Sequence, residues 1–132
     1  MSGFLPMPYV EDVEATSRWY QDLFGLHSGH GGPEFEMLVG TEGGHDIVLQ
    51  LHKADLDEHG SIVVPGSPNG LGVILEHQVA DVDAVHALHA RATAMGADVQ
   101  NEPWFNAQAH HTEFTVRDPN GYFIGVHSPF TP

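Results

Sequence analysis

The sequence predicts an α+β fold built from two tandem βαβββ modules. Two segments with helical spacing of apolar residues begin with the same pattern, Asp-Val-acidic-Ala, at Asp12 and Asp81, which lie 69 residues apart in a chain of 132. Each segment follows one short extended run and precedes several others. A repeat of this order over about half the chain indicates two copies of one supersecondary unit.

The two helices are predicted from their caps and from their apolar spacing. Asp12 and Asp81 are suited to cap helix N-termini, and Gly25 and Gly96 to end the same helices. The apolar positions of the first helix are Val13, Tyr20, Leu23 and Phe24. Those of the second, expected to line one face, are Val82, Val85, Leu88, Ala92 and Met95.

The strands are predicted from short extended runs bounded by turn residues. One run precedes each helix, at residues 4–10 and 73–79, and others follow at residues 35–39, 46–52, 98–101, 112–117 and 122–127. The turn Asp-Pro-Asn-Gly at residues 118–121 joins the last two runs and is the strongest hairpin signal in the chain. Residues 27–32, with the sequence His-Ser-Gly-His-Gly-Gly, are expected to form a loop.

The length fits a single domain, because domains usually hold about 100–200 residues. We expect residues 1–132 to form one domain of two modules, at about residues 4–54 and 71–130. Residues 55–70 are polar and rich in Gly, Pro and Ser, and are expected to form a linker with a short strand at residues 62–64.

The composition disfavours several classes of function. With 18 acidic and 4 basic residues the formal net charge is −14, so nucleic acids and anionic membranes are disfavoured as partners and cations are favoured. No apolar run approaches the roughly 20 residues of a membrane span. The absence of cysteine excludes disulfides and thiolate chemistry. The N-terminal sequence lacks the features of a secretory signal, and we expect a cytoplasmic protein.

The tandem module order, the two helix starts and the Asp-Pro-Asn-Gly turn resemble the glyoxalase/bleomycin-resistance/extradiol-dioxygenase superfamily, also called the vicinal oxygen chelate superfamily. The resemblance extends from about Phe4 to Phe130 and is strongest in PYVEDVEATSRWYQDLFGL and FTVRDPNGYFIGV. It implies a curved mixed sheet with a concave cleft. It does not imply one reaction, because this fold hosts metal lyases, dioxygenases, epimerases and metal-free drug-binding proteins.

In the metal-dependent members of this superfamily, one residue from each of four strands holds the ion. By their positions relative to the helix caps and the hairpin turn, the matching residues here are Leu5, Gln50, Ile74 and Gly125. Only Gln50 has a side chain that can ligate a metal. The resemblance therefore implies that the usual metal site is absent, and we expect no metal cofactor.

A displaced metal site is the alternative. His52, Glu76 and His127 lie two residues beyond three of these positions and share their strand faces. Two histidines and one carboxylate suit iron, zinc or manganese. The competing interpretation is that the three are polar residues lining a ligand cavity.

Without a metal, the resemblance implies a cleft suited to a planar or amphipathic organic molecule. Aromatic faces stack on flat ligands and attract cations, and carboxylates add negative charge. The expected ligand-contacting residues are Met7, Tyr9, Gln50, His52, Glu76, Gln78, Trp104, Phe105, Glu113, Phe123 and His127. Trp104 is the strongest candidate, because we expect it and Phe105 in a loop bounded by proline. The adjacent His110 and His111 point to opposite faces of a strand, so at most one of them can enter the cleft.

Two prolines, Pro6 and Pro8, indicate that the first strand is a sheet edge or an exchanged arm, because proline donates no ladder hydrogen bond. Drug-binding members of the superfamily are dimers that swap this strand and form two ligand clefts at the interface. The resemblance therefore implies a homodimer, with a monomeric edge strand as the alternative.

Three functions are compatible with these observations. The leading hypothesis is a metal-independent homodimer, similar to the bleomycin-resistance proteins of antibiotic resistance, that sequesters an aromatic or cationic compound in a cleft at the dimer interface without transforming it. The second is a metal-dependent lyase or dioxygenase that uses the displaced site. The third is a metal-free isomerase or cyclase in which Glu76 or a neighbouring histidine acts as general base.

Overall fold

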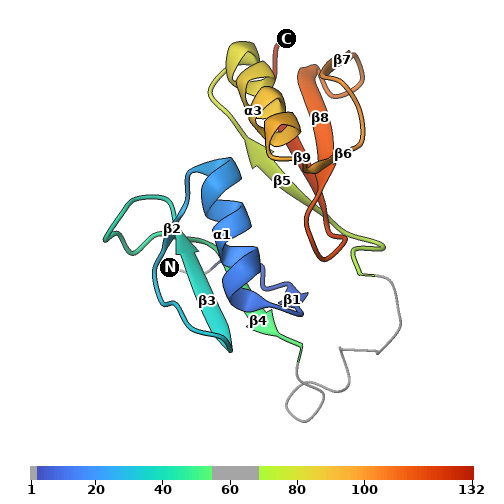
Figure 1. Cartoon of the computed structure of the whole chain (residues 1–132). Helices are drawn as coiled ribbons and strands as arrows, with labels where there is room; N and C mark the ends of the chain where they lie inside the picture. The colour runs from blue at the N-terminus through green and yellow to red at the C-terminus, as the bar shows by residue number, and fades with distance from the viewer. Residues whose placement is uncertain (1–2, 55–68) are drawn as a thin grey trace. The chain divides into compact units, whose positions relative to one another are not determined.

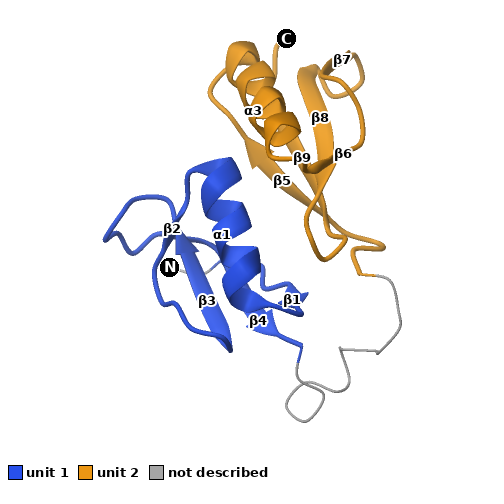
Figure 2. Ribbon diagram, viewed as in Figure 1, with its two compact units in different colours: residues 1–67 blue, residues 68–132 orange. Residues whose placement is uncertain are grey.

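The computed structural model describes residues 3–54 and 69–132, and the chain divides into two compact units, Met1–Ser67 and Pro68–Pro132 (Figures 1 and 2). The expected strand at residues 62–64, and all but the end of the expected linker, lie outside the described residues. In the described part of each unit, one helix packs on one face of that unit's own mixed sheet. The fold class is therefore α+β, as predicted.

Unit 1 has a four-stranded sheet in the order β1-β4-β3-β2. Its strands are β1 (Tyr9–Val10), β2 (His27–Ser28), β3 (Phe35–Val39) and β4 (Ile47–Lys53), and its helix is α1 (Val13–Phe24). β1 runs parallel to β4, and the other pairs are antiparallel. Helix α1 contacts β2, β3 and β4, and so covers one face of this sheet.

The first strand lies at the edge of the sheet, as its prolines predicted, but it is shorter than the expected residues 4–10. The carbonyl oxygens of Pro6 and Pro8 accept hydrogen bonds from the backbone N–H groups of Gln50 (3.0 Å) and His52 (3.2 Å). Proline has no N–H to donate in return, so this part of the segment makes only half a ladder.

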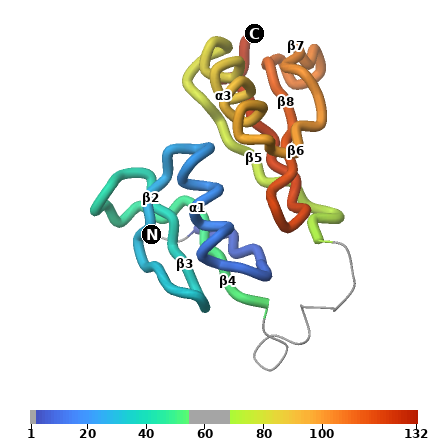
Figure 3. The backbone as a smooth tube through the Cα atoms, in the orientation of Figure 1, coloured from blue at the N-terminus to red at the C-terminus, as the bar shows by residue number. Residues whose placement is uncertain are grey.

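Unit 2 has the strand order β5-β9-β8-β6, with β7 paired to β8. Its strands are β5 (Ile74–Gln78), β6 (Asp98–Val99), β7 (Trp104–Asn106), β8 (His111–Arg117) and β9 (Phe123–His127), and its helix is α3 (Val82–Ala94). β5 runs parallel to β9, and the other pairs are antiparallel. The path of the chain through both units can be followed in Figure 3.

Both helices begin where the sequence predicted. The side chains of Asp12 and Asp81 accept hydrogen bonds from the backbone N–H groups of Ala15 (3.0 Å) and Ala84 (2.8 Å). Helix α1 ends at Gly25, which has the left-handed φ of 68° that glycine adopts without steric cost. No helix in the described part of the chain has the length and hydropathy of a membrane span.

The prediction of one apolar stripe along the second helix is wrong at both ends of the stripe, where the side chains are exposed. Val82 is 43% exposed and Met95 is 38% exposed, whereas Val85 and Ala92 are buried. Val82 is the first residue of α3 and Met95 is its C-cap, so only the middle of the helix packs against the sheet.

Two segments expected to be loops contain short strands. Residues 27–28 form β2, which pairs with β3, and residues 104–106 form β7, which pairs with β8. Strands of two or three residues are too short for an alternating pattern to reveal them.

The Asp-Pro-Asn-Gly hairpin forms as predicted. The buried side chain of Asp118 accepts hydrogen bonds from the backbone N–H groups of Asn120 (2.8 Å) and Tyr122 (2.9 Å). Gly121 has a φ of 97°, which residues with a side chain rarely adopt. The turn therefore sets the register of β8 against β9.

Candidate functional site

The face of the unit 2 sheet opposite α3, here called the open face, carries most of the predicted site residues. Along β8, Thr112, Phe114 and Val116 are buried, and the residues that alternate with them are only half-buried. The registers of β5, β7 and β9 against their neighbours place these residues together on the open face: Glu76, Gln78, Trp104, Asn106, His111, Glu113, Phe123, Gly125 and His127.

Glu76 and His127 form a close pair on this face. The Nε2 atom of His127 lies 3.5 Å from a carboxylate oxygen of Glu76. The Nδ1 atom of the same ring lies 2.9 Å from the backbone oxygen of Ser128, which can accept a hydrogen bond from it. This contact directs Nε2 toward the carboxylate. Gly125 provides the space, because a Cβ atom there would lie 2.8 Å from both carboxylate oxygens.

A second acid–imidazole pair lies beside the first. The rings of His111 and His127 are stacked, with centroids 4.5 Å apart. Nε2 of His111 lies 3.4 Å from Oε1 of Glu113, and the Asn106 side chain donates a hydrogen bond of 2.5 Å to the same oxygen. Two carboxylates and two imidazoles are therefore contiguous across β5, β9 and β8.

The surroundings of Glu76 favour its protonated form. Burial raises the pKa of Glu76, the charge of His127 lowers it, Glu113 raises it and His111 lowers it, and the pKa is above its ordinary value overall. A carboxyl group with a raised pKa beside an imidazole holds its proton to a higher pH than an ordinary glutamate, and general acid–base chemistry uses such pairs.

Trp104 lies directly opposite Glu113 across the β7–β8 pair. Its side chain shares the open face with Glu113 and is 47% exposed. Phe105, which was expected beside it, lies opposite Thr112 and so belongs to the other face of β7. Phe123 is on the open face, where the guanidinium of Arg117 lies 4.8 Å from its ring centre.

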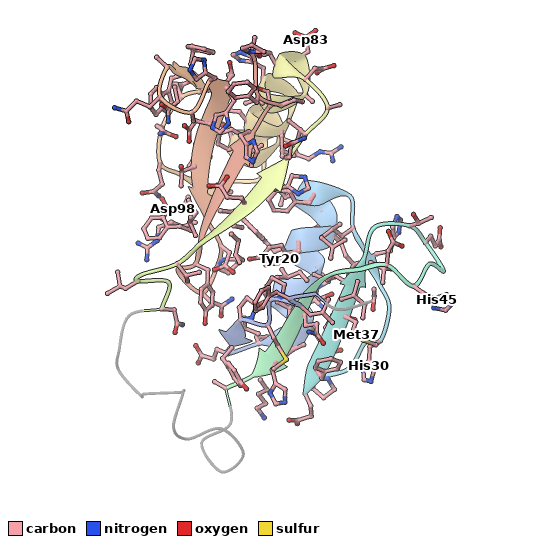
Figure 4. The ribbon with its side chains drawn as sticks, turned by 180° about the vertical axis from the view of Figure 1, so that it is seen from behind. Tyr20, His30, Met37, His45, Asp83 and Asp98 are labelled. Atoms are coloured by element: carbon pink, nitrogen blue, oxygen red, sulfur yellow. The ribbon has the colours of Figure 1, made fainter. Side chains whose placement is uncertain are left out.

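The face of the unit 1 sheet opposite α1 carries a row of four rings. His52 lies 5.3 Å from Tyr9 and 6.2 Å from Phe35, and His30 lies 5.1 Å from Phe35, between ring centres. Met37 is the cross-strand partner of Gln50 on this face. Figure 4 draws these side chains from behind, with His30 and Met37 labelled on unit 1.

Of two further predicted residues, Met7 lies just before the edge strand β1 and Gln50 lies on β4. Met7 is half-buried, and the Gln50 side chain donates a hydrogen bond of 3.4 Å to the backbone oxygen of Leu5.

Unit 1 also buries a carboxylate that the sequence did not single out. Glu36 is 3% exposed and accepts hydrogen bonds of 2.8–3.0 Å from five donors. The donors are the hydroxyls of Ser17 and Ser28 and the backbone N–H groups of His30, Gly31 and Met37. Burial raises the pKa of Glu36, but hydrogen bonds from Gly31, Ser28, Ser17 and His30 outweigh it and lower the pKa overall.

Three of the four positions that match the family's metal ligands lack a donor, and only Gln50 has one. Leu5, Ile74 and Gly125 have no side-chain donor, so these residues do not fit such a site. For the displaced alternative, Glu76 and His127 come together in unit 2, whereas His52 belongs to unit 1. Within residues 3–54 and 69–132 no group of three or more His, Cys, Asp or Glu residues is arranged to hold a metal ion.

Two residues of the site were not identified from the sequence. His111 was one of two adjacent histidines whose faces were undecided, and its spacing of two from Glu113 on one strand is the signal that places both on one face. Asn106 belongs to a segment expected to be a loop, so no pattern pointed to it.

Comparison with protein families agrees with the fold. The model of the glyoxalase/bleomycin resistance protein/dioxygenase superfamily matches residues 7–126. The chain belongs to this superfamily. No curated protein sequence matches it significantly.

Solved structures of the superfamily match nearly the whole chain. A glyoxalase-related enzyme from Fulvimarina pelagi has a TM-score of 0.78 at 19% identity, over 98% of this chain and 88% of that one. A lactoylglutathione lyase from Agrobacterium tumefaciens has a TM-score of 0.70 at 19% identity, over 97% and 94%. At these identities the likeness shows the fold alone.

Proposed function

We propose that this member of the superfamily is a metal-independent small-molecule-binding protein whose ligand is a flat aromatic cation. The observation that carries the proposal is the pairing of an accessible indole with a carboxylate, Trp104 opposite Glu113, on the open face of unit 2. An aromatic face and an adjacent carboxylate together recognise a ring that bears a positive charge.

The second carboxylate on this face supports a cationic ligand. Glu76 and Glu113 are close enough for each to affect the other, since Glu113 raises the pKa of Glu76. A bound cation relieves the repulsion between two neighbouring carboxylates. The net charge of −14 adds long-range attraction for cations.

Metal independence and dimerisation are parts of the same proposal. Metal independence is supported by Leu5, Ile74 and Gly125 at the positions matching the family's ligands. We further propose a cytoplasmic homodimer that uses the edge strand β1 for exchange between subunits. This part is supported by the half ladder that Pro6 and Pro8 make with β4. Sequestration of a toxic aromatic cation, as in antibiotic resistance, is the role that such a binding protein serves.

A matched pair of ligands tests the proposal. N-methylacridinium and acridine have the same flat shape, but at pH 8 only the first is charged. The Trp19→Phe variant retains Trp104 as its single tryptophan, so quenching of its fluorescence reports binding at the site. We expect saturable binding of the cation by protein treated with a metal chelator, and affinity for the neutral ring at least about tenfold lower.

Two charge-neutralising variants complete the test. Glu113→Gln should weaken cation binding, whereas Glu102→Gln, which removes the same charge from an 89% exposed side chain, should not. Equal affinity for the two ligands, or a cation affinity that needs added metal, would contradict the proposal. Sedimentation of the protein with and without residues 1–8 tests the dimer.

A metal-free isomerase is a second candidate, favoured by the pair that Glu76 and His127 form. A carboxyl group of raised pKa lies 3.5 Å from an imidazole, which is the arrangement of a general acid–base pair. Incubation of a bound ligand in deuterated water would reveal proton exchange by NMR. Exchange that disappears in Glu76→Gln, with binding retained, would establish turnover. It would overturn the proposal that the protein binds its ligand without transforming it.

A further inference from the structure

The side chain of Asn106 joins the turn before β8 to one of the two carboxylates of the open face. Its Oδ1 atom accepts hydrogen bonds from the backbone N–H groups of Gln108 (3.1 Å) and Ala109 (3.3 Å). Its Nδ2 atom donates to Oε1 of Glu113 at 2.5 Å. One amide group therefore shapes the turn and holds the carboxylate at the same time.

The two backbone donors determine which way this amide points. If the amide were flipped, Nδ2 would face two N–H groups, and neither of those contacts would be a hydrogen bond. Oδ1 must therefore face the turn, and the donating end of the amide must face Glu113. A donor fixed in this way requires an acceptor, and a carboxylate oxygen is the strongest available.

The polar contacts of Glu113 with Asn106 and His111 involve the same one of its two oxygens. In the part of the chain that the structure describes, both Asn106 and His111 approach Oε1. The Glu113 side chain is only 19% exposed, so its orientation is restrained by packing as well. Neither of these contacts involves Oε2, the oxygen that remains for a ligand stacked on the neighbouring Trp104.

We propose that Asn106 is a positioning residue, which holds Glu113 by Oε1 so that Oε2 receives the positive charge of the ligand. This inference rests on the proposed binding of a flat cation. It assigns unequal roles to the two carboxylates: Glu113 is held in place by an amide donor, whereas Glu76 meets the imidazole of His127.

Two variants separate this role from a structural one. Asn106→Ser retains a short side-chain oxygen that can accept from the turn but cannot reach Glu113. Asn106→Asp combined with Glu113→Gln restores the hydrogen bond in the opposite direction at the same net charge, but moves the carboxylate to position 106. Asn101→Ser is the control, because the side-chain oxygen of Asn101 also accepts a hydrogen bond from a backbone N–H group, that of Thr115 at 2.8 Å.

The readout is the ratio of affinities for N-methylacridinium and acridine, measured by Trp104 fluorescence in the Trp19→Phe background. We expect Asn106→Ser to lower this ratio about fivefold, because it weakens binding of N-methylacridinium and leaves binding of acridine unchanged. Asn101→Ser should leave the ratio unchanged. The double variant should match the parent protein in melting temperature but keep a lowered ratio.

The other outcomes overturn either the positioning role of Asn106 or the proposed cation binding. An unchanged ratio in Asn106→Ser, or full recovery of the ratio in the double variant, overturns the positioning role while leaving cation binding intact. If the parent protein does not prefer the cation, the proposed function fails and this inference fails with it. If Asn106→Ser does not fold, the double variant alone decides.

Discussion

The two units use a sheet glutamate in opposite ways. Glu36 in unit 1 is buried and accepts five hydrogen bonds, and its pKa is lowered. Glu76 in unit 2 has a half-exposed side chain that meets His127, and its pKa is raised. Burial raises both pKa values, so the hydrogen-bond donors around Glu36 account for the difference.

The comparison separates a structural carboxylate from one that we propose to be functional. Donors from α1, β2 and the following loop converge on Glu36, which ties these segments together. Glu76 instead lies beside Glu113, and the two repel each other. A protein keeps such a destabilising pair where a ligand or a proton can relieve the repulsion.

Removal of the two side chains should have very different effects on stability. Glu36→Ala leaves three backbone donors and two hydroxyls without their acceptor, and we expect a loss of about 3 kcal/mol in the free energy of unfolding. Glu76→Ala should change it by less than about 0.5 kcal/mol, because the side chain is 51% exposed. Urea denaturation at pH 7 measures both, and equal losses would remove the distinction.

The serines that bind Glu36 should have smaller effects. Ser17→Ala and Ser28→Ala each remove one hydroxyl donor, at 2.9 and 2.8 Å from Oε2. We expect each to cost about 1 kcal/mol in unfolding free energy. In the Glu36→Ala background the same substitutions should cost much less, because their partner is already missing. Additive costs in this double-mutant cycle would show that the serines act independently of Glu36.

A methyl group at position 125 tests the packing of Glu76. The Cβ atom of Gly125→Ala would lie 2.8 Å from the Glu76 carboxylate, whose flexible side chain can move away. We expect a loss of about 0.5 kcal/mol in unfolding free energy and a shift of the His127 ring signals in NMR spectra. Combination with Glu76→Ala should abolish the loss. A loss that persists in the double variant would mean that the backbone of β9, and not Glu76, meets the methyl group.

The pH dependence of stability should have opposite signs at the two positions. Because the folded-state pKa of Glu36 is lowered, its contribution is present above the ordinary value of 4.5 and is lost as pH falls through the folded-state pKa. Because the folded-state pKa of Glu76 is raised, its contribution to stability is present below pH 4.5 and is lost as pH rises through the folded-state pKa.

Glutamine variants show whether each glutamate stabilises the protein more at high or at low pH. The stability of the parent protein relative to Glu36→Gln should increase as pH rises, and relative to Glu76→Gln it should decrease. Denaturation midpoints between pH 3 and 7 show both trends, and trends of equal sign would refute the assigned pKa directions.

Much of the fold was predictable from local signals. The caps at Asp12 and Asp81, the glycine stop at Gly25 and the hairpin turn all form as predicted, because each depends on a few neighbouring residues. β2 and β7 were not predictable, since two or three residues become a strand only when a distant partner pairs with them.

The candidate site was predictable only in part. Alternation gave the strand face of Glu76 and of His127, and the resemblance to the superfamily implied that these faces converge; the two side chains lie 3.5 Å apart. Asn106 and Glu36 were not identified, because their roles depend on donors and acceptors that the fold brings together. For Glu36, the serine donors lie 8 and 19 residues away in the chain.

The central claim is that Glu36 serves stability and Glu113 serves ligand binding. The most direct test measures the unfolding free energy and the N-methylacridinium affinity of Glu36→Gln and Glu113→Gln, side by side. We expect Glu36→Gln to lose stability and keep its affinity, and Glu113→Gln to keep its stability and lose affinity about tenfold. A Glu113→Gln variant that binds the cation as tightly as the parent protein would contradict the account.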